Sequence, residues 1–204
     1  MANAKPQNFL IGTLVYTLLF AAAAENIGGK DSDNICGGEE RWDVKVVIDP
    51  NADMARKTFE EATIADLLKI DTKKPENKYG ENKPRMEIET HLYKIRHCFI
   101  TDVLREDDND LHLVIEDGRG NHMIAEIPDP KCPDAKKSDR TGDFEQVRNT
   151  MLQFSNNYRH FMFAITGYLF VDKKHGQTGR APNNVELHPI IELTKEKKIN
   201  PILQ

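Results

Sequence analysis

The sequence predicts a mainly β (α+β) fold: a five-stranded OB-like barrel with one helix between its third and fourth strands, plus an N-terminal accessory segment. After Glu87 the chain contains five runs rich in β-branched and aromatic residues. A single segment with helical spacing separates the third run from the fourth. A helix at this place in a five-stranded Greek-key barrel is typical of the OB architecture. A mixed α+β sheet of another topology is the alternative.

Turn and loop sequences separate the expected strands. The step Asp117-Gly118 predicts a tight turn between the second and third strands, and Pro128 ends the third. The strands are expected at 88–104, 111–116, 122–127, 159–171 and 185–193. The helix is expected over 143–157, where apolar residues recur at steps of three and four: Phe144, Val147, Met151 and Phe154.

The part before the barrel, residues 25–86, is expected to be an extension with few regular elements. The run 41–48 contains the only tryptophan and is expected to be a short strand. Thr63 and Asp66 form a variant of the capping box, which predicts the start of a short helix. Residues 71–85 are polar and interrupted by prolines, which indicates a linker or a long surface loop. The barrel domain is expected over 87–195, followed by a polar tail, 196–204.

Residues 1–24 are interpreted as a cleavable secretory signal peptide. Lys5 precedes an apolar run over 9–24, and Ala22 and Ala24 fit the small-x-small rule for signal peptidase. The alternative is a transmembrane anchor, but the run is shorter than the roughly 20 residues that span a bilayer. We therefore expect an exported protein, periplasmic or extracellular, with no membrane span after cleavage.

Three cysteines are present, and export would place them where disulfides persist. Three pairings exist for one bridge. Cys36 and Cys132 stand in irregular, Gly- or Pro-rich segments, whereas Cys98 stands in a strand pattern where a buried thiol is common. These contexts favour Cys36–Cys132. The absence of a C-x-x-C pattern argues against a cysteine zinc site or a thiol-redox motif.

The charge and the aromatic residues disfavour a nucleic-acid partner. The formal net charge is −5, whereas a sequence-blind nucleic-acid binder normally carries a basic surface. The second and third expected strands contain no Phe, Tyr or Trp on which bases could stack. A nucleic acid therefore remains a less favoured partner, and the ligand is unknown.

Two acid-x-His pairs carry the strongest chemical signal. Asp110 and His112 stand two apart on the second strand, and Glu186 and His188 stand two apart on the fifth, so each pair shares a strand face. Both pairs adjoin loops 105–110 and 172–184, which would flank the usual OB binding face. Carboxylates and imidazoles bind zinc or manganese, and such a metal could activate water; the same pairs could also supply a general base. The alternative is an ordinary polar strand face.

The loop 173–180 is basic and contains glycines, so its amides and cations could hold an anion. It is not a Walker A loop, because no G-K-[ST] step opens a helix. An ordinary surface loop is the alternative. The candidate ligand-binding residues here are His175, Gln177, Arg180 and Asn183.

Four blocks of the sequence resemble those of a group of small exported bacterial proteins of unassigned function. The blocks are CGGEERWDVK, DNDLHLVIED, MIAEIPDPKC and HGQTGRAPNNVELHPIIEL. The resemblance implies bacterial export and supports the Cys36–Cys132 pairing. It also implies that the two acid-x-His pairs belong to one site.

Three functions are compatible with these observations. The first is an exported OB-like binding module that takes an unknown ligand beside the 173–184 loop. The second is a metal-dependent hydrolase, nuclease-like or phosphodiesterase-like, built on the acid-x-His pairs. The third is a structural envelope protein whose polar motifs only stabilise turns.

Overall fold

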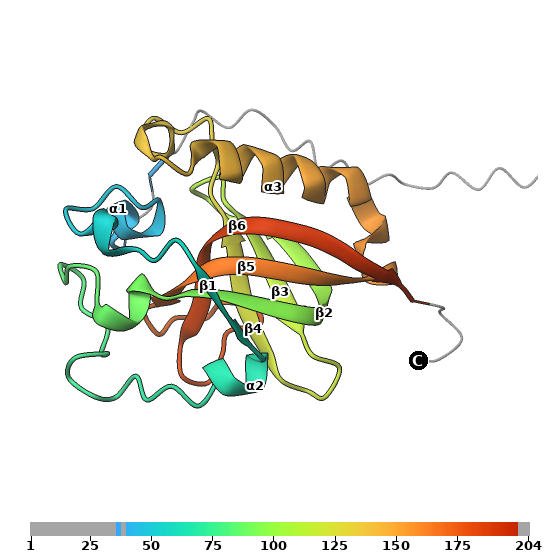
Figure 1. Cartoon of the computed structure of the whole chain (residues 1–204), viewed down its shortest axis with the longest axis horizontal. Helices are drawn as coiled ribbons and strands as arrows, with labels where there is room; N and C mark the ends of the chain where they lie inside the picture. The colour runs from blue at the N-terminus through green and yellow to red at the C-terminus, as the bar shows by residue number, and fades with distance from the viewer. Residues whose placement is uncertain (1–35, 38–39, 200–204) are drawn as a thin grey trace, which may run out of the picture. The chain divides into compact units, whose positions relative to one another are not determined.

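Five strands close into a barrel in the computed structural model, which describes residues 36–37 and 40–199 (Figure 1). The strands are β2 (Leu92–Arg105), β3 (Leu111–Glu116), β4 (His122–Ile127), β5 (Phe161–Val171) and β6 (Val185–Lys198). Their order around the barrel is β2-β3-β4-β6-β5, and β5 pairs with β2 to close it. Only the β4–β6 pair of the barrel is parallel. This is the expected OB-like arrangement, and closure excludes an open mixed sheet. The expected signal peptide, 1–24, lies outside the described residues.

Helix α3 (Thr141–Phe154) follows β4 as expected and continues into the 3₁₀ turn η4 (Ser155–His160). It packs against β6 and β4 and lies along the outside of the barrel (Figure 1). Its buried face consists of residues from the predicted apolar stripe: Phe144, Val147 and Met151. The spacing of these residues at three and four explains why this segment is helical.

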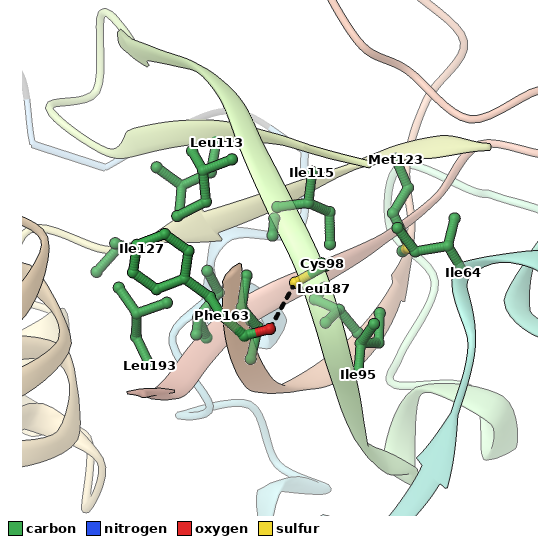
Figure 2. Packing of buried hydrophobic residues seen from close by; sticks show 14 of the residues in the cluster. Ile64, Ile95, Cys98, Leu113, Ile115, Met123, Ile127, Phe163, Leu187 and Leu193 are labelled. Atoms are coloured by element: carbon green, nitrogen blue, oxygen red, sulfur yellow. Dashed lines mark hydrogen bonds between the residues drawn. The ribbon is translucent and has the colours of Figure 1, made fainter. Parts of the chain in front are cut away.

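The core fills the inside of the barrel (Figure 2). Leu113 and Ile115 point inward from β3, because alternate residues of a strand face opposite sides. Cys98 is a free, buried cysteine whose thiol donates to the Phe163 carbonyl at 3.2 Å. Burial raises the pKa of the Cys98 thiol to about 12. This cysteine therefore behaves as a small core residue, as its strand context predicted.

The prediction of a strand at 41–48 is wrong, because the chain forms the short helix α1 (Trp42–Lys45) there. Trp42 and Val46, four residues apart, meet on one side of this turn and pack in a cluster with Phe144 of α3. Arg41, just before the helix, has a left-handed φ of 64°. Tertiary burial of one helical face has overridden the β-branched composition of the segment.

Further along, the structure contains a strand that the pattern did not predict. Strand β1 (Phe59–Ala62) pairs in parallel with β2. Helix α2 (Ile64–Leu67) begins as predicted, since the Thr63 hydroxyl accepts from the Asp66 amide and Asp66 accepts from the Thr63 amide. Residues 71–85 form turns and loops, as expected, before the 3₁₀ turn η2 (Glu87–Thr90). A further 3₁₀ turn, η3 (Ala135–Lys137), precedes α3.

Covalent and ionic contacts fasten the accessory segment to the barrel. A disulfide joins Cys36 to Cys132, in the loop after β4. Arg41 and Glu89 form a buried ion pair at 2.5 Å, and Glu89 also accepts from the Val171 amide at the end of β5. Asp49 and Arg85 form a second buried ion pair, at 2.6 Å, within the accessory segment itself. No helix within the described ranges is long and apolar enough to cross a membrane.

Candidate functional site

The four side chains of the acid-x-His pairs lie on the outer face of the barrel. Strand alternation turns their apolar neighbours inward and leaves these four outside. All four are nonetheless at most 2 % exposed: Asp110, His112, Glu186 and His188. The accessory segment covers the His188 side, because Arg41 and Lys45 of the α1 region lie over the ring of Phe170, which itself contacts His188. The 172–184 loop covers His112, which contacts the Thr178 carbonyl.

Glu126 of β4 lies at the centre of the cluster and joins the two pairs. Its Oε1 is 2.9 Å from His112 Nδ1, and its Oε2 is 2.9 Å from His188 Nδ1. The residue was not predicted, because no histidine stands two positions from it. The available signal was a single carboxylate within an otherwise apolar strand, since such a group is buried only when it is paired.

His112 has both ring nitrogens occupied. Its Nε2 donates to the Thr178 carbonyl at 2.9 Å, and its Nδ1 faces Glu126 and also Glu106, at 3.2 Å. Burial alone would lower the pKa of His112, but the hydrogen bond and the charge of Glu126 raise it. His112 is therefore a charged link that ties β3 to the 172–184 loop.

His188 differs in the partner of its Nε2. This atom forms an ion pair with Asp110 Oδ2 at 3.3 Å, and neither atom has a hydrogen bond in the described part of the chain. The other oxygen of Asp110 accepts from the Asp129 amide at 3.0 Å, which fixes the carboxylate. Two zinc ligands at bond lengths of about 2.0–2.1 Å and the tetrahedral angle stand roughly 3.3 Å apart. The pair is thus spaced like two ligands of one ion.

Burial and neighbouring charges shift the pKa values of the ionisable groups in the cluster. Burial raises the pKa of Asp110 to about 6, and burial together with Asp172 and Glu126 raises the pKa of Glu186 to about 8. Burial opposes the charge of His188, but Glu126 and Asp110 hold its pKa well above the usual value. The metal-free site therefore retains protons near neutral pH, which a divalent cation would displace on binding.

The four predicted loop residues do not gather at one point. Asn183 donates to the carbonyls of Leu67 and Ile70, at 3.0 and 3.1 Å, so it fastens the loop to the end of α2. His175 lies near two carboxylates, with its Nε2 3.6 Å from Asp172 Oδ2. The Gln177 Oε1 is buried without a hydrogen-bond partner among the described residues. Arg180 lines a surface pocket together with Asn183.

Comparison with known proteins identifies no family. No protein-family model and no curated protein matches the sequence. Among solved structures, the chain is similar to a putative aspartyl-tRNA synthetase from Leishmania major Friedlin, at 10 % identity and a TM-score of 0.40. The match covers 72 % of this chain and 23 % of that one.

Proposed function

We propose that this protein is an exported bacterial OB-like binding module for a divalent metal, zinc or manganese, held by Asp110 Oδ2 and His188 Nε2, with Glu126 fixing the His188 ring through Nδ1. The observation that supports the proposal is the buried ion pair of Asp110 Oδ2 and His188 Nε2, which lie 3.3 Å apart and have no hydrogen bond within the described residues. One ligand atom from each of the three residues lies within 4.8 Å of the others. A mixed oxygen and nitrogen set suits zinc and manganese.

The surroundings of His188 support the same proposal. Its Nδ1 lies 3.3 Å from Glu186 Oε1, and a metal-bound histidine commonly presents its second nitrogen to a carboxylate, which orients the ring. The alternative is a purely structural polar cluster, in which Asp110 and His188 form only an ion pair.

Burial favours metal binding over hydrolysis at this site. His188 is 1 % exposed beneath the accessory segment, so a substrate could reach it only after that segment moved. In the arrangement seen here, the metal would hold β3, β4 and β6 together under the segment. Export is supported by the Cys36–Cys132 disulfide, because disulfides persist in oxidising compartments.

The test is metal content together with metal titration. The protein is purified after export without a metal-affinity tag, and its metal is measured by mass spectrometry; zinc and manganese are then titrated into the chelator-treated protein. We expect about one ion per chain and an affinity at least about 10-fold weaker in D110N and H188Q. H122A is the matched control, because His122 is exposed on β4.

A folded wild-type protein that takes up neither metal, and whose melting temperature neither metal changes, would overturn the proposal. Equal loss of metal in H122A would place the ion elsewhere.

A further inference from the structure

A pocket of about 700 Å³ opens between the 71–85 loop and the 172–184 loop. Its size is within the range of small-molecule sites, roughly 300–1,000 Å³. Its polar lining includes Lys73, Lys78, Tyr79, Asp172, Lys174 and Arg180. None of Asp110, His188 and Glu126 lines it, although Asp172 also lies close enough to Glu186 to raise its pKa.

The lining is positively charged in a chain that is negative overall. Four cationic side chains face two carboxylates, Asp71 and Asp172, whereas the whole chain has a net charge of −5. Within the part of the chain that the structure describes, the three lysines have no ion-pair partner. Arg180 donates to the Ala181 carbonyl and to the Asn184 side chain, both uncharged. These cations are therefore available to an anionic ligand.

Two buried polar groups without hydrogen bonds line the pocket. Asp172 is 2 % exposed, and its Oδ2 forms an ion pair with His175 Nε2 at 3.6 Å, but neither of its carboxylate oxygens has a hydrogen bond within the described residues. The Tyr79 hydroxyl is also buried and unpartnered there. Both residues line the pocket. Buried polar groups normally have hydrogen bonds, so hydroxyl groups of a ligand could bind at these two positions.

We infer that this pocket binds a hydroxyl-bearing phosphate monoester of the sugar-phosphate class. The exposed lysines would contact the phosphate at the mouth, and the buried Asp172 would accept hydrogen bonds from sugar hydroxyls at the inner end. Inorganic phosphate is a less favourable ligand, because the Asp172 carboxylate would repel an anion that reached the inner end of the pocket. A free sugar phosphate and the phosphorylated end of a polynucleotide share this chemistry.

Isothermal titration of the exported protein, in chelator, tests the inference with four probes: ribose 5-phosphate, ribose, inorganic phosphate and a 5′-phosphorylated oligonucleotide. We expect ribose 5-phosphate to bind at least about 10-fold more tightly than inorganic phosphate or ribose. K73Q/K174Q should weaken this binding about 10-fold or more, whereas K136Q, at an exposed lysine outside the pocket, should not. D172N should reduce the affinity for ribose 5-phosphate to that for inorganic phosphate.

Tighter binding of the oligonucleotide than of ribose 5-phosphate, lost in the same variants, would support the inference and identify a polynucleotide end as the source. Equal affinity for ribose 5-phosphate and inorganic phosphate would overturn it, as would no binding. Binding that appears only with an added divalent cation would also overturn it, and would indicate a cation site formed by Asp172 with Glu40 and His175. None of these results depends on the proposed metal at His188.

Discussion

Asp110, beside β3, and His188, on β6, form a buried ion pair on the outer face of the barrel, with Oδ2 and Nε2 3.3 Å apart. The carboxylate is held from its other side by the Asp129 amide. An asparagine at this position could keep that hydrogen bond but would lose the negative charge. The D110N variant therefore distinguishes a role of Asp110 in metal binding from a structural role.

For D110N we expect a metal-free protein at least as stable as the wild type at pH 8, since the variant removes a buried charge whose pKa burial has raised to about 6. Metal should raise the melting temperature of the wild type but not that of D110N. Thermal melts with chelator and with zinc measure both effects. A metal-free D110N that is clearly less stable than the wild type would instead assign Asp110 a structural role.

Glu186 predicts a pH dependence of the metal-free protein. Its pKa is raised from 4.5 to about 8 in the folded state, mainly by burial, so the folded protein keeps a proton that the unfolded chain releases. Its contribution to stability is therefore full below about pH 4.5 and declines as the pH rises to about 8. E186Q should remove this decline and be more stable than the wild type at pH 8 by on the order of 2 kcal/mol, with little difference at pH 4.5. Urea unfolding in chelator at the two pH values measures it.

E145Q, on an exposed position of α3, is the control for E186Q and should follow the wild type at both pH values. An E186Q protein that loses stability equally at both values would contradict the assigned direction of the shift.

Removal of the disulfide should destabilise mainly the region around α1. Cys36 and Cys132 are 96 residues apart in the sequence, so opening the bond frees a long loop in the unfolded chain. C36S/C132S should lose about 2–4 kcal/mol of stability. Hydrogen exchange should rise most around α1, because its cluster contains Cys132. Uniform loss of protection across the barrel strands would contradict a local role.

Two glycines of the 172–184 loop, Gly179 and Gly176, allow a substitution and its matched control. Gly179 has a φ of +76°, and a Cβ there would lie 2.5 Å from Val114 Cγ2. G179A should therefore destabilise the protein by about 1–3 kcal/mol or displace the loop, whereas G176A, with no neighbour within 4 Å, should change stability by less than about 0.5 kcal/mol. Chemical unfolding compares them; equal effects would mean that the loop does not rest on β3 as described.

The sequence predicted best those elements in which buried residues recur at the regular spacing of a strand or a helix. Strands β3 and β4 have the predicted bounds, and α3 has the predicted apolar face, because each element buries one regular side. Strand β1 was missed since its residues FEEA are mostly exposed and gain their pairing from the edge of β2. This strand forms because β2 lies beside it, and a local sequence pattern does not contain that information.

The sequence identified the four residues of the acid-x-His pairs, but it identified neither Glu126 nor the burial of the cluster. The face shared by each acid-x-His pair followed from strand alternation. The position of Glu126 between the two histidines depends on the register of β3 with β4, where His112 is directly opposite it. The burial of the site depends on α1, a segment that was expected to be a strand.

The bond between Cys36 and Cys132 also has a consequence for the order of assembly. Cys132 follows β4, so the cover over the outer face can be locked only after the chain beyond β4 is available to pair with a residue near the start of the accessory segment. A reduced chain would hold α1 by its non-covalent contacts, including the Arg41–Glu89 ion pair. The bond would therefore make the cover harder to open once formed, so a ligand enclosed beneath α1 should exchange more slowly in the oxidised protein than in the reduced one.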